Sequence, residues 1–170
     1  MKPNTSEVDG LKSLLAYDAE TGAFTWRKPR GGQVAGSQAG CLNRNGYTEI
    51  TVHRRIYKAH RLAWLYTYGE WPPAEIDHIN GNKSDNRLAN LRPATRAQNV
   101  ANTALRSDSA SGVKGVHWSG SSRKWQAQIK HNGKSKHLGV YANIEDAAAA
   151  YRRAATEWFG DYARVEEGRL

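Results

Sequence analysis

Apolar positions recur with two different spacings in the first half of the chain, and each spacing predicts a type of element. Helical spacing predicts one helix over residues 7–16 and a second over 60–68, where Gly69 follows the last apolar position. Alternation and short apolar runs predict strands instead. The strands expected in this half are 24–26, 47–52, 55–59, the run that holds Asp77 and His78, and a short strand around 88–92.

The second half has a different pattern after residues 103–111, which are small and polar and indicate a linker. Asn132 and Gly133 form a pair that is typical of a tight hairpin turn. Asn143 is a good cap for an Ala-rich helix that runs to Phe159, before Gly160. The expected strands are 112–118, 124–130 and 136–141. This order predicts a three-stranded antiparallel sheet packed on one helix, so the whole chain is expected to have an α+β fold.

Composition narrows the classes of function that fit this chain. Lys and Arg number 25 against 16 Asp and Glu, which gives a formal charge of +9 and favours nucleic acid as the partner. No apolar run approaches the ~20 residues that cross a membrane, and the first residues lack the apolar core of a signal peptide. The lone Cys41 excludes an internal disulfide and a Cys-cluster zinc site. We therefore expect a cytoplasmic protein without membrane association.

Asp77 and His78 are the strongest candidates for chemistry. They are neighbours in a short apolar run, and a loop rich in Asn, Asp and Gly follows them. A carboxylate that binds a metal ion, beside a histidine that takes a proton from water, is what hydrolysis of a phosphodiester needs. Asn86 and Asn90 can bond to the backbone of the loop and orient His78. Taken alone, this composition is also ordinary turn chemistry.

A helix start follows the loop and carries one more side chain that can bind metal. Thr95 and Gln98 match a capping box, which predicts a helix with Asn99 in its first turn or just beyond. His60 is a second candidate for catalysis, although a histidine at a helix N-terminus also serves simply to satisfy backbone groups. Arg61 and Arg87 are candidate phosphate contacts, and solvated surface arginines are an equal alternative.

These motifs resemble those of HNH endonucleases of the phage and homing type. The segments that carry the resemblance are 59–64, 76–82, 85–87, 90–92 and 95–99. The resemblance implies a ββα-metal fold, with His78 as the general base and one Mg²⁺ or Mn²⁺ on Asp77 and Asn99. Asn90, the middle Asn of the motif, would brace the loop that carries His78. Asn99 stands where many relatives have His, and the Cys pairs of zinc-containing relatives are absent, so no structural zinc is expected.

Residues 112–138 contain many cations and aromatic side chains but no Asp or Glu. Their motifs, and the Ala-rich segment after them, resemble the APETALA/ethylene-response-factor DNA-binding domain up to about Arg164. That resemblance implies a sheet that contacts DNA, although Lys or His replaces several of the family's arginines. The bland alternative is a solvated basic hairpin. The DNA-binding candidates in this half are Lys114, Gly115, His117, Trp118, Arg123, Gln128, Lys130 and Lys136.

Together these features predict a metal-dependent endonuclease that cuts double-stranded DNA. The expected parts are an N-terminal α/β region (1–58), a nuclease core (59–104), a linker (105–111) and a DNA-binding domain (112–164). One rival is a DNA-binding or transcription protein that keeps a nuclease-like scaffold without catalysis, and another is a nuclease that acts on RNA. The sequence leaves open the target site, whether one strand or both are cut, and whether the chain is a monomer or a dimer.

Overall fold

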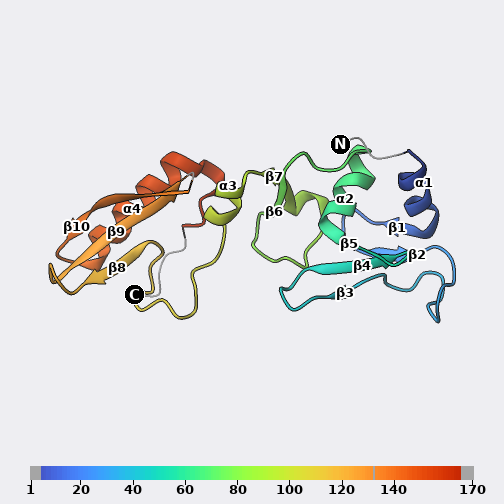
Figure 1. Ribbon diagram of the computed structural model, residues 1–170, viewed down its shortest axis with the longest axis horizontal. Coiled ribbons are helices and arrows are strands. Elements are labelled where there is room, and N and C mark those ends of the chain that lie inside the picture. The colour runs from blue at the N-terminus through green and yellow to red at the C-terminus, as the bar shows by residue number, and fades with distance from the viewer. Residues whose placement is uncertain (1–4, 132, 166–170) are drawn as a thin grey trace. The chain divides into compact units, whose positions relative to one another are not determined.

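The computed structural model describes residues 5–131 and 133–165, which divide into two compact units, Met1–Ala94 and Thr95–Leu170 (Figure 1). Each unit has its own hydrophobic core. Helices and strands occur in both, so the fold is α+β as predicted. Among the described residues, no helix is long and apolar enough to cross a membrane.

The first unit combines two helices with short antiparallel strands. Its elements are α1 (Thr5–Leu14), β1 (Leu15–Tyr17), β2 (Phe24–Trp26), β3 (Cys41–Leu42), β4 (Thr48–Val52), β5 (Arg55–Lys58), α2 (Ala59–Tyr68), β6 (Glu75–His78), the 3₁₀ turn η1 (Leu88–Asn90) and β7 (Leu91–Ala94). Among the described residues of this unit the strands pair as β1–β2, β3–β4–β5 and β6–β7. The succession β4–β5–α2 is consistent with the ββα arrangement expected of a nuclease.

One apolar core joins all parts of the first unit. Leu15, Ile50, Leu62 and Leu65 are fully buried in it, and β1, β4 and α2 contribute them. Ile76 of β6 belongs to the same cluster, so the strand that carries Asp77 and His78 rests on the core. The region expected at 1–58 and the residues up to 94 thus share one core, and the functional boundary at 58/59 stays a prediction.

Two elements of this unit differ from the sequence prediction. The helix expected over 7–16 ends at Leu14, because Leu15 and Ala16 pair with β2 in a strand instead. Pairing with the next strand of the chain here outweighs local helical spacing. The strand expected at 88–92 begins only at Leu91, since the residues before it form η1, in which the Asn90 N–H donates to the Arg87 carbonyl. In contrast, α2 ends at Gly69 as predicted, with Gly69 in the left-handed region at φ 75°.

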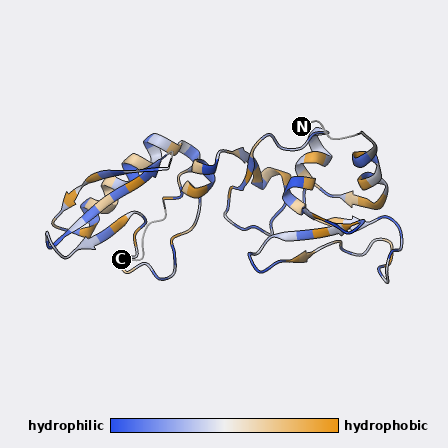
Figure 2. Ribbon diagram, in the orientation of Figure 1, coloured by the Kyte–Doolittle hydropathy of each residue, from blue (hydrophilic) through white to orange (hydrophobic). Residues whose placement is uncertain are grey.

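The second unit is a three-stranded antiparallel sheet packed on a helix. Its elements are α3 (Arg96–Ala101), β8 (Val116–Ser119), β9 (Lys124–His131), β10 (Lys134–Tyr141), α4 (Ile144–Phe159) and the 3₁₀ turn η2 (Gly160–Tyr162). The strand order is β10–β9–β8. Figure 2 shows both hydrophilic and hydrophobic residues along α4, and the buried ones, such as Ala147, Tyr151 and Ala154, follow the spacing of one helix face. Asn143 caps α4 by accepting from the Asp146 N–H at 2.9 Å, as predicted.

Small residues let α4 approach the sheet closely. Ala147, Ala150 and Ala154 of α4 are buried against the strands. The first strand begins at Val116 and not at 112, because the residues before it turn through glycines with positive φ. At Gly115 (φ 69°) a Cβ would lie 2.3 Å from the Tyr151 ring. Of the turn expected at Asn132 and Gly133, Asn132 lies outside the described residues.

Candidate active site and nucleic-acid interface

The hairpin β6–β7 positions both Asp77 and His78. In its register Asp77 lies opposite Arg92 and His78 opposite Leu91, and the two candidate side chains are 3% and 4% exposed. The Asp77 Oδ2 atom accepts hydrogen bonds from Nε and Nη2 of Arg92, each at 2.8 Å. Sequence reasoning did not single out Arg92 as a partner of Asp77. The register of the β6–β7 hairpin, which places Arg92 opposite Asp77, is the feature that could have indicated it. This pair offsets the charge of a carboxylate that would be costly to bury alone.

Asn86 fixes the orientation of the His78 ring. The Asn86 Oδ1 atom lies 3.3 Å from His78 Nε2, while the Asn86 amide nitrogen donates to the Ser84 carbonyl at 3.0 Å. With Oδ1 as the acceptor, Nε2 carries the proton and Nδ1 is the basic nitrogen of the neutral ring. Burial lowers the pKa of His78, and the bond from Asn86 and the charge of Asp77 oppose that shift. His78 is therefore neutral near pH 7 and able to take a proton.

Asn90 closes the loop that follows His78. Its side-chain oxygen accepts from the Asn80 N–H at 3.0 Å, and its amide donates to the Asp85 carbonyl at 2.8 Å. Its backbone carbonyl also accepts from the Ile79 N–H at 2.9 Å. The Asn90 side chain is thus a bridge across the loop, which is the geometry that a bracing role requires.

The turn between β1 and β2 packs against the far side of this loop. The Tyr17 hydroxyl donates to the Asn86 carbonyl at 2.8 Å, and the Leu88 N–H donates to the Ala19 carbonyl at 3.0 Å. Gly22 approaches so closely that a Cβ would lie 2.4 Å from the Arg87 backbone nitrogen. Burial raises the pKa of Tyr17 to about 12, so its hydroxyl stays a donor. Sequence reasoning identified only a turn here and missed the contact.

His60 and Tyr47 surround the ring of His78. The His60 ring lies edge-on to His78, with centroids 5.1 Å apart, and the Tyr47 ring is 5.3 Å from His60 and 6.1 Å from His78. Burial lowers the pKa of His60 to about 3, and the neighbouring His78, Arg61 and Lys58 contribute to that shift. His60 Nδ1 is buried without a hydrogen-bond partner among the described residues, so His60 packs as a neutral ring. Tyr47 was not expected from the sequence.

The remaining candidates of the nuclease part lie in different settings. Asn99 is on α3 in the second unit, where Thr95 and Gln98 form the predicted capping box, with bonds of 3.2 and 2.8 Å. Arg87 forms a two-point ion pair with Asp85, and Arg61 donates to the Ala74 carbonyl at 3.2 Å. Within the described ranges, no three His, Cys, Asp or Glu side chains gather as a metal-binding cluster.

The expected DNA-binding residues of the sheet fall on two faces. His117, Gln128 and Lys130 point away from α4, because their neighbours along the strands are the buried Val116, Ala127 and Ile129. The outward side chains are paired across strands, as shown by His117 Nε2 at 3.1 Å from Gln126 Oε1. We call this surface, formed by His117, Gln126, Gln128, Lys130, Ser135 and His137, the helix-free face.

The other candidates lie elsewhere in the second unit. Lys136 is on the α4 side, with its ammonium 4.7 Å above the Trp158 ring, and Trp118 packs edge-on against Trp125 at 5.2 Å. Arg123 is exposed in the turn between β8 and β9. The Lys114 ammonium donates to the carbonyls of Ala101 and Thr103, at 2.6 and 2.7 Å, at the C-terminal end of α3. Gly115 lies so close to the Tyr151 ring of α4 that a side chain there would collide with it.

Comparisons with known proteins complete the description of the site. Residues 57–101 match the family described as HNH endonuclease. Protein 3.8 of Escherichia phage T7 is 32% identical over 116 residues, which cover 66% of this chain and 95% of that protein. A protein of Acanthamoeba polyphaga mimivirus, named as an uncharacterized HNH endonuclease, is 31% identical over 129 residues, 72% of this chain and 63% of that relative. This chain therefore spans less than two thirds of the mimivirus protein. No solved structure matches.

Proposed function

Because this chain belongs to the HNH endonuclease family, a family of DNA phosphodiesterases, we propose that it cuts DNA with His78 as the general base and one divalent metal ion. The observation that carries this proposal is the setting of His78. A buried, neutral imidazole is held through Nε2 by Asn86, which makes Nδ1 the nitrogen that accepts a proton from the attacking water. Asn90 keeps the loop after His78 closed and thereby preserves this orientation.

The donor chemistry of Asp77 and Asn99, which lie in different units, suits a hard, oxygen-binding cation. Asp77 supplies a buried carboxylate oxygen and Asn99 an amide oxygen, and Mg²⁺ or Mn²⁺ in nucleases is held by one or two such groups together with substrate phosphate and water. When bound there, the ion would neutralise charge on the scissile phosphate and the leaving oxygen.

We assign duplex DNA binding to the second unit. The helix-free face carries His117, Gln128 and Lys130, and the sequence from 112 to 138 contains no acidic residue that would repel phosphates. The resemblance to the APETALA/ethylene-response-factor domain supports the same surface. We assign further phosphate contacts to Arg123 in the adjoining turn, and to Arg61 and Arg87 in the first unit. Lys136 and Trp118 lie on the opposite side of the sheet, the side that faces α4.

Supercoiled-plasmid cleavage tests the catalytic part directly. Wild type should nick or linearise the plasmid in Mg²⁺ or Mn²⁺ and not in a chelator, and His78→Ala should lose this activity while it still binds DNA. His53→Ala is the matched control, since His53 is exposed in the turn between β4 and β5. Cleavage that persists in His78→Ala would refute the assigned base.

The alternative is a DNA-binding protein without catalysis, and the Asp77–Arg92 ion pair is the observation that favours it. An Arg bonded twice to the candidate metal ligand competes with a cation for that carboxylate. On this alternative, wild type retards duplex DNA in a gel but never cuts it in either metal, and His78→Ala binds equally well. Competition between duplex DNA and a structured RNA distinguishes the remaining rival, an RNA-directed nuclease.

A further inference from the structure

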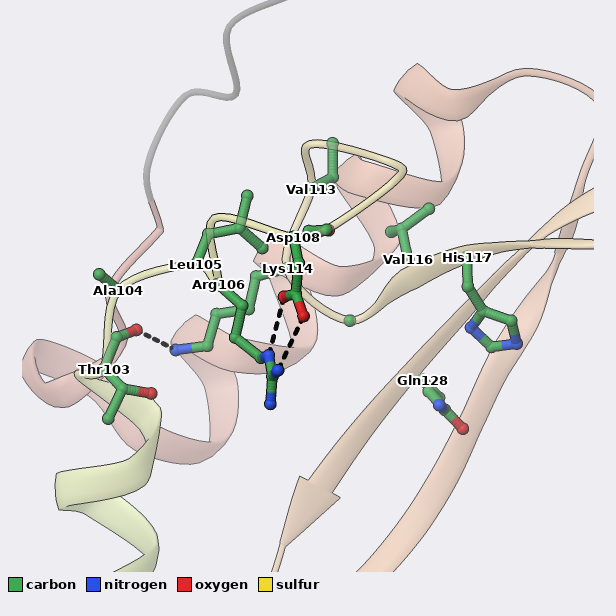
Figure 3. A pocket seen from close by; sticks show the side chains of 12 residues that line it. Thr103, Ala104, Leu105, Arg106, Asp108, Val113, Lys114, Val116, His117 and Gln128 are labelled. Atoms are coloured by element: carbon green, nitrogen blue, oxygen red, sulfur yellow. Dashed lines mark hydrogen bonds and ion pairs between the residues drawn. The ribbon is translucent and has the colours of Figure 1, made fainter.

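The segment 103–109 packs beside the sheet of the second unit and lines a pocket of about 490 Å³ (Figure 3). Arg106 and Asp108 contribute side chains from this segment, and His117 and Gln128 line the pocket from the strands. Both strand residues belong to the helix-free face. The segment that the sequence indicates as a linker therefore borders the surface to which we assign DNA binding. The volume lies within the range of protein pockets that bind small ligands.

Arg106 is held in this pocket by a two-point ion pair. Its Nε donates to Asp108 Oδ1 at 2.9 Å and its Nη2 donates to Asp108 Oδ2 at 2.8 Å (Figure 3). The two side chains are 84% and 65% exposed. Ion pairs exposed to this degree contribute little to stability, so fold stability alone does not account for the arrangement.

The ion pair fixes the plane of the guanidinium and determines which edge it presents. Arg has five N–H groups in a rigid plane, and the bonds to Asp108 use one from Nε and one from Nη2. The edge formed by Nη1 and Nη2 then presents two parallel N–H groups away from Asp108. Such an edge matches two acceptors in one plane, either O6 and N7 of guanine or two oxygens of a phosphate.

Three other polar side chains of the pocket have hydrogen-bond partners within the second unit. The Lys114 ammonium donates to backbone carbonyls, and the Gln128 Oε1 atom accepts from the Ser135 hydroxyl at 3.2 Å. His117 Nε2 lies 3.1 Å from Gln126 Oε1. Arg106 differs from them because it presents two parallel N–H groups, from Nη1 and Nη2, on the side away from Asp108.

We propose that Arg106, held by Asp108, is a nucleic-acid contact that binds a pair of acceptors on DNA, from a guanine edge or a phosphate. The inference rests on the proposed binding of DNA by the helix-free face, and it gives the 103–109 segment a direct part in recognition. Asp108 acts as a positioning residue, because its carboxylate keeps the guanidinium plane fixed.

The test uses the full chain with His78→Ala, so that bound DNA is not cut. Bound molecules are selected from a pool of random 30-bp duplexes in Mg²⁺, sequenced, and the best duplex is then measured by fluorescence anisotropy at several salt concentrations. Arg106→Ala is compared with Arg152→Ala in the same background. Arg152 is exposed on α4 and does not line the pocket, so Arg152→Ala removes the same charge from the same unit and leaves the pocket unchanged.

A guanine contact predicts that Arg106→Ala loses a guanine preference at one position of the selected motif and weakens binding of the best duplex about 5- to 150-fold. A phosphate contact predicts an unchanged motif, a uniform loss of affinity, and a salt slope shallower by about 0.9. The proposal is supported if Arg106→Ala shows either result and Arg152→Ala shows neither. If Arg106→Ala and Arg152→Ala behave alike, the proposal is wrong. If the His78→Ala parent binds no duplex, the DNA-binding assignment itself has failed, which is a different outcome.

Asp108→Asn separates positioning from general electrostatics. Neutralising an acid beside DNA should strengthen binding to every sequence, whereas release of the Arg106 plane should weaken discrimination against the wrong base at the same motif position. Glu157→Asn on the exposed part of α4 is the charge-matched control. With a guanine contact we expect reduced discrimination in Asp108→Asn only. If Arg106→Ala loses the guanine preference but Asp108→Asn discriminates between bases as well as its parent does, the positioning role of Asp108 is wrong.

Discussion

Substitution of Gly22 by Ala should unfold the first unit more readily and loosen the loop that holds His78. Gly22 has a φ of 75°, and a Cβ there would lie 2.4 Å from the Arg87 backbone nitrogen and 2.5 Å from the Asn86 carbonyl carbon. Backbone atoms cannot rotate out of the way as a flexible side chain can. The turn and the loop must therefore separate, and the bond from Leu88 to Ala19 must lengthen.

Two contributions make up the expected loss of stability. The left-handed conformation costs an L-residue about 1–2 kcal/mol, and forced displacement of packed groups costs about 1–3 kcal/mol more. Gly36→Ala isolates the first contribution, because Gly36 has a similar φ of 82° and, apart from its chain neighbours, no atom would lie within 4 Å of a Cβ there. For a unit of this size, each 1 kcal/mol lowers Tm by about 4–8 °C.

Calorimetry of the full chain and amide hydrogen exchange at Leu88 provide the measurement. Gly22→Ala should lower the Tm of the first unit by at least about 4 °C more than Gly36→Ala, and it alone should accelerate exchange of the Leu88 N–H. Plasmid cleavage should fall in parallel. Equal Tm values for the two variants, with Leu88 exchange unchanged, would refute the inference that this turn supports the loop.

Three further predictions follow from buried or bonded charges. Arg92→Met should destabilise the first unit by about 3–5 kcal/mol in urea denaturation, because it removes the cation that is bonded to the buried Asp77 carboxylate, and a loss under 1 kcal/mol would contradict this. Burial lowers the pKa of His60 to about 3 in the folded chain, so between pH 6.5 and 3 the unfolded chain binds a proton at His60 and the folded chain does not. The free energy of unfolding should therefore decrease as the pH falls through this window, by up to about 1.4 kcal/mol per pH unit. His60→Phe should flatten this pH dependence, as measured by urea denaturation at a series of pH values. Lys114→Met should destabilise the second unit by about 1–2 kcal/mol, since its ammonium bonds carbonyls at the C-terminal end of α3, whereas a role limited to DNA would leave urea midpoints unchanged.

Local patterns were sufficient to predict most of the helices and strands. The capping box at Thr95, the stop at Gly69 and the cap at Asn143 depend on neighbours within four residues, so the sequence displays them directly. The loop-bridging geometry of Asn90 also agrees with the role that the family resemblance implies. The roles assigned to individual site residues stay predictions until cleavage is measured.

Contacts between distant residues were beyond the reach of the sequence. Tyr17 and Asn86 are 69 positions apart, and nothing in either segment indicates that the other is its partner. The same limit explains the helix end at Leu14, where pairing of Leu15 with Trp26 decides the conformation. Lys114 shows the limit for charges, because a lysine that bonds carbonyls and one that binds phosphates look identical in a sequence.

The contact between the β1–β2 turn and the His78 loop sets a lower bound on the size of a transplantable nuclease. A fragment cut at residue 57, where the family match begins, would keep His78 and Asn86 but lose Tyr17 and Gly22. It would also expose the apolar surface that α1 and β4 cover. An engineer who fuses this catalytic part to a different DNA-binding module should therefore start the fragment at α1.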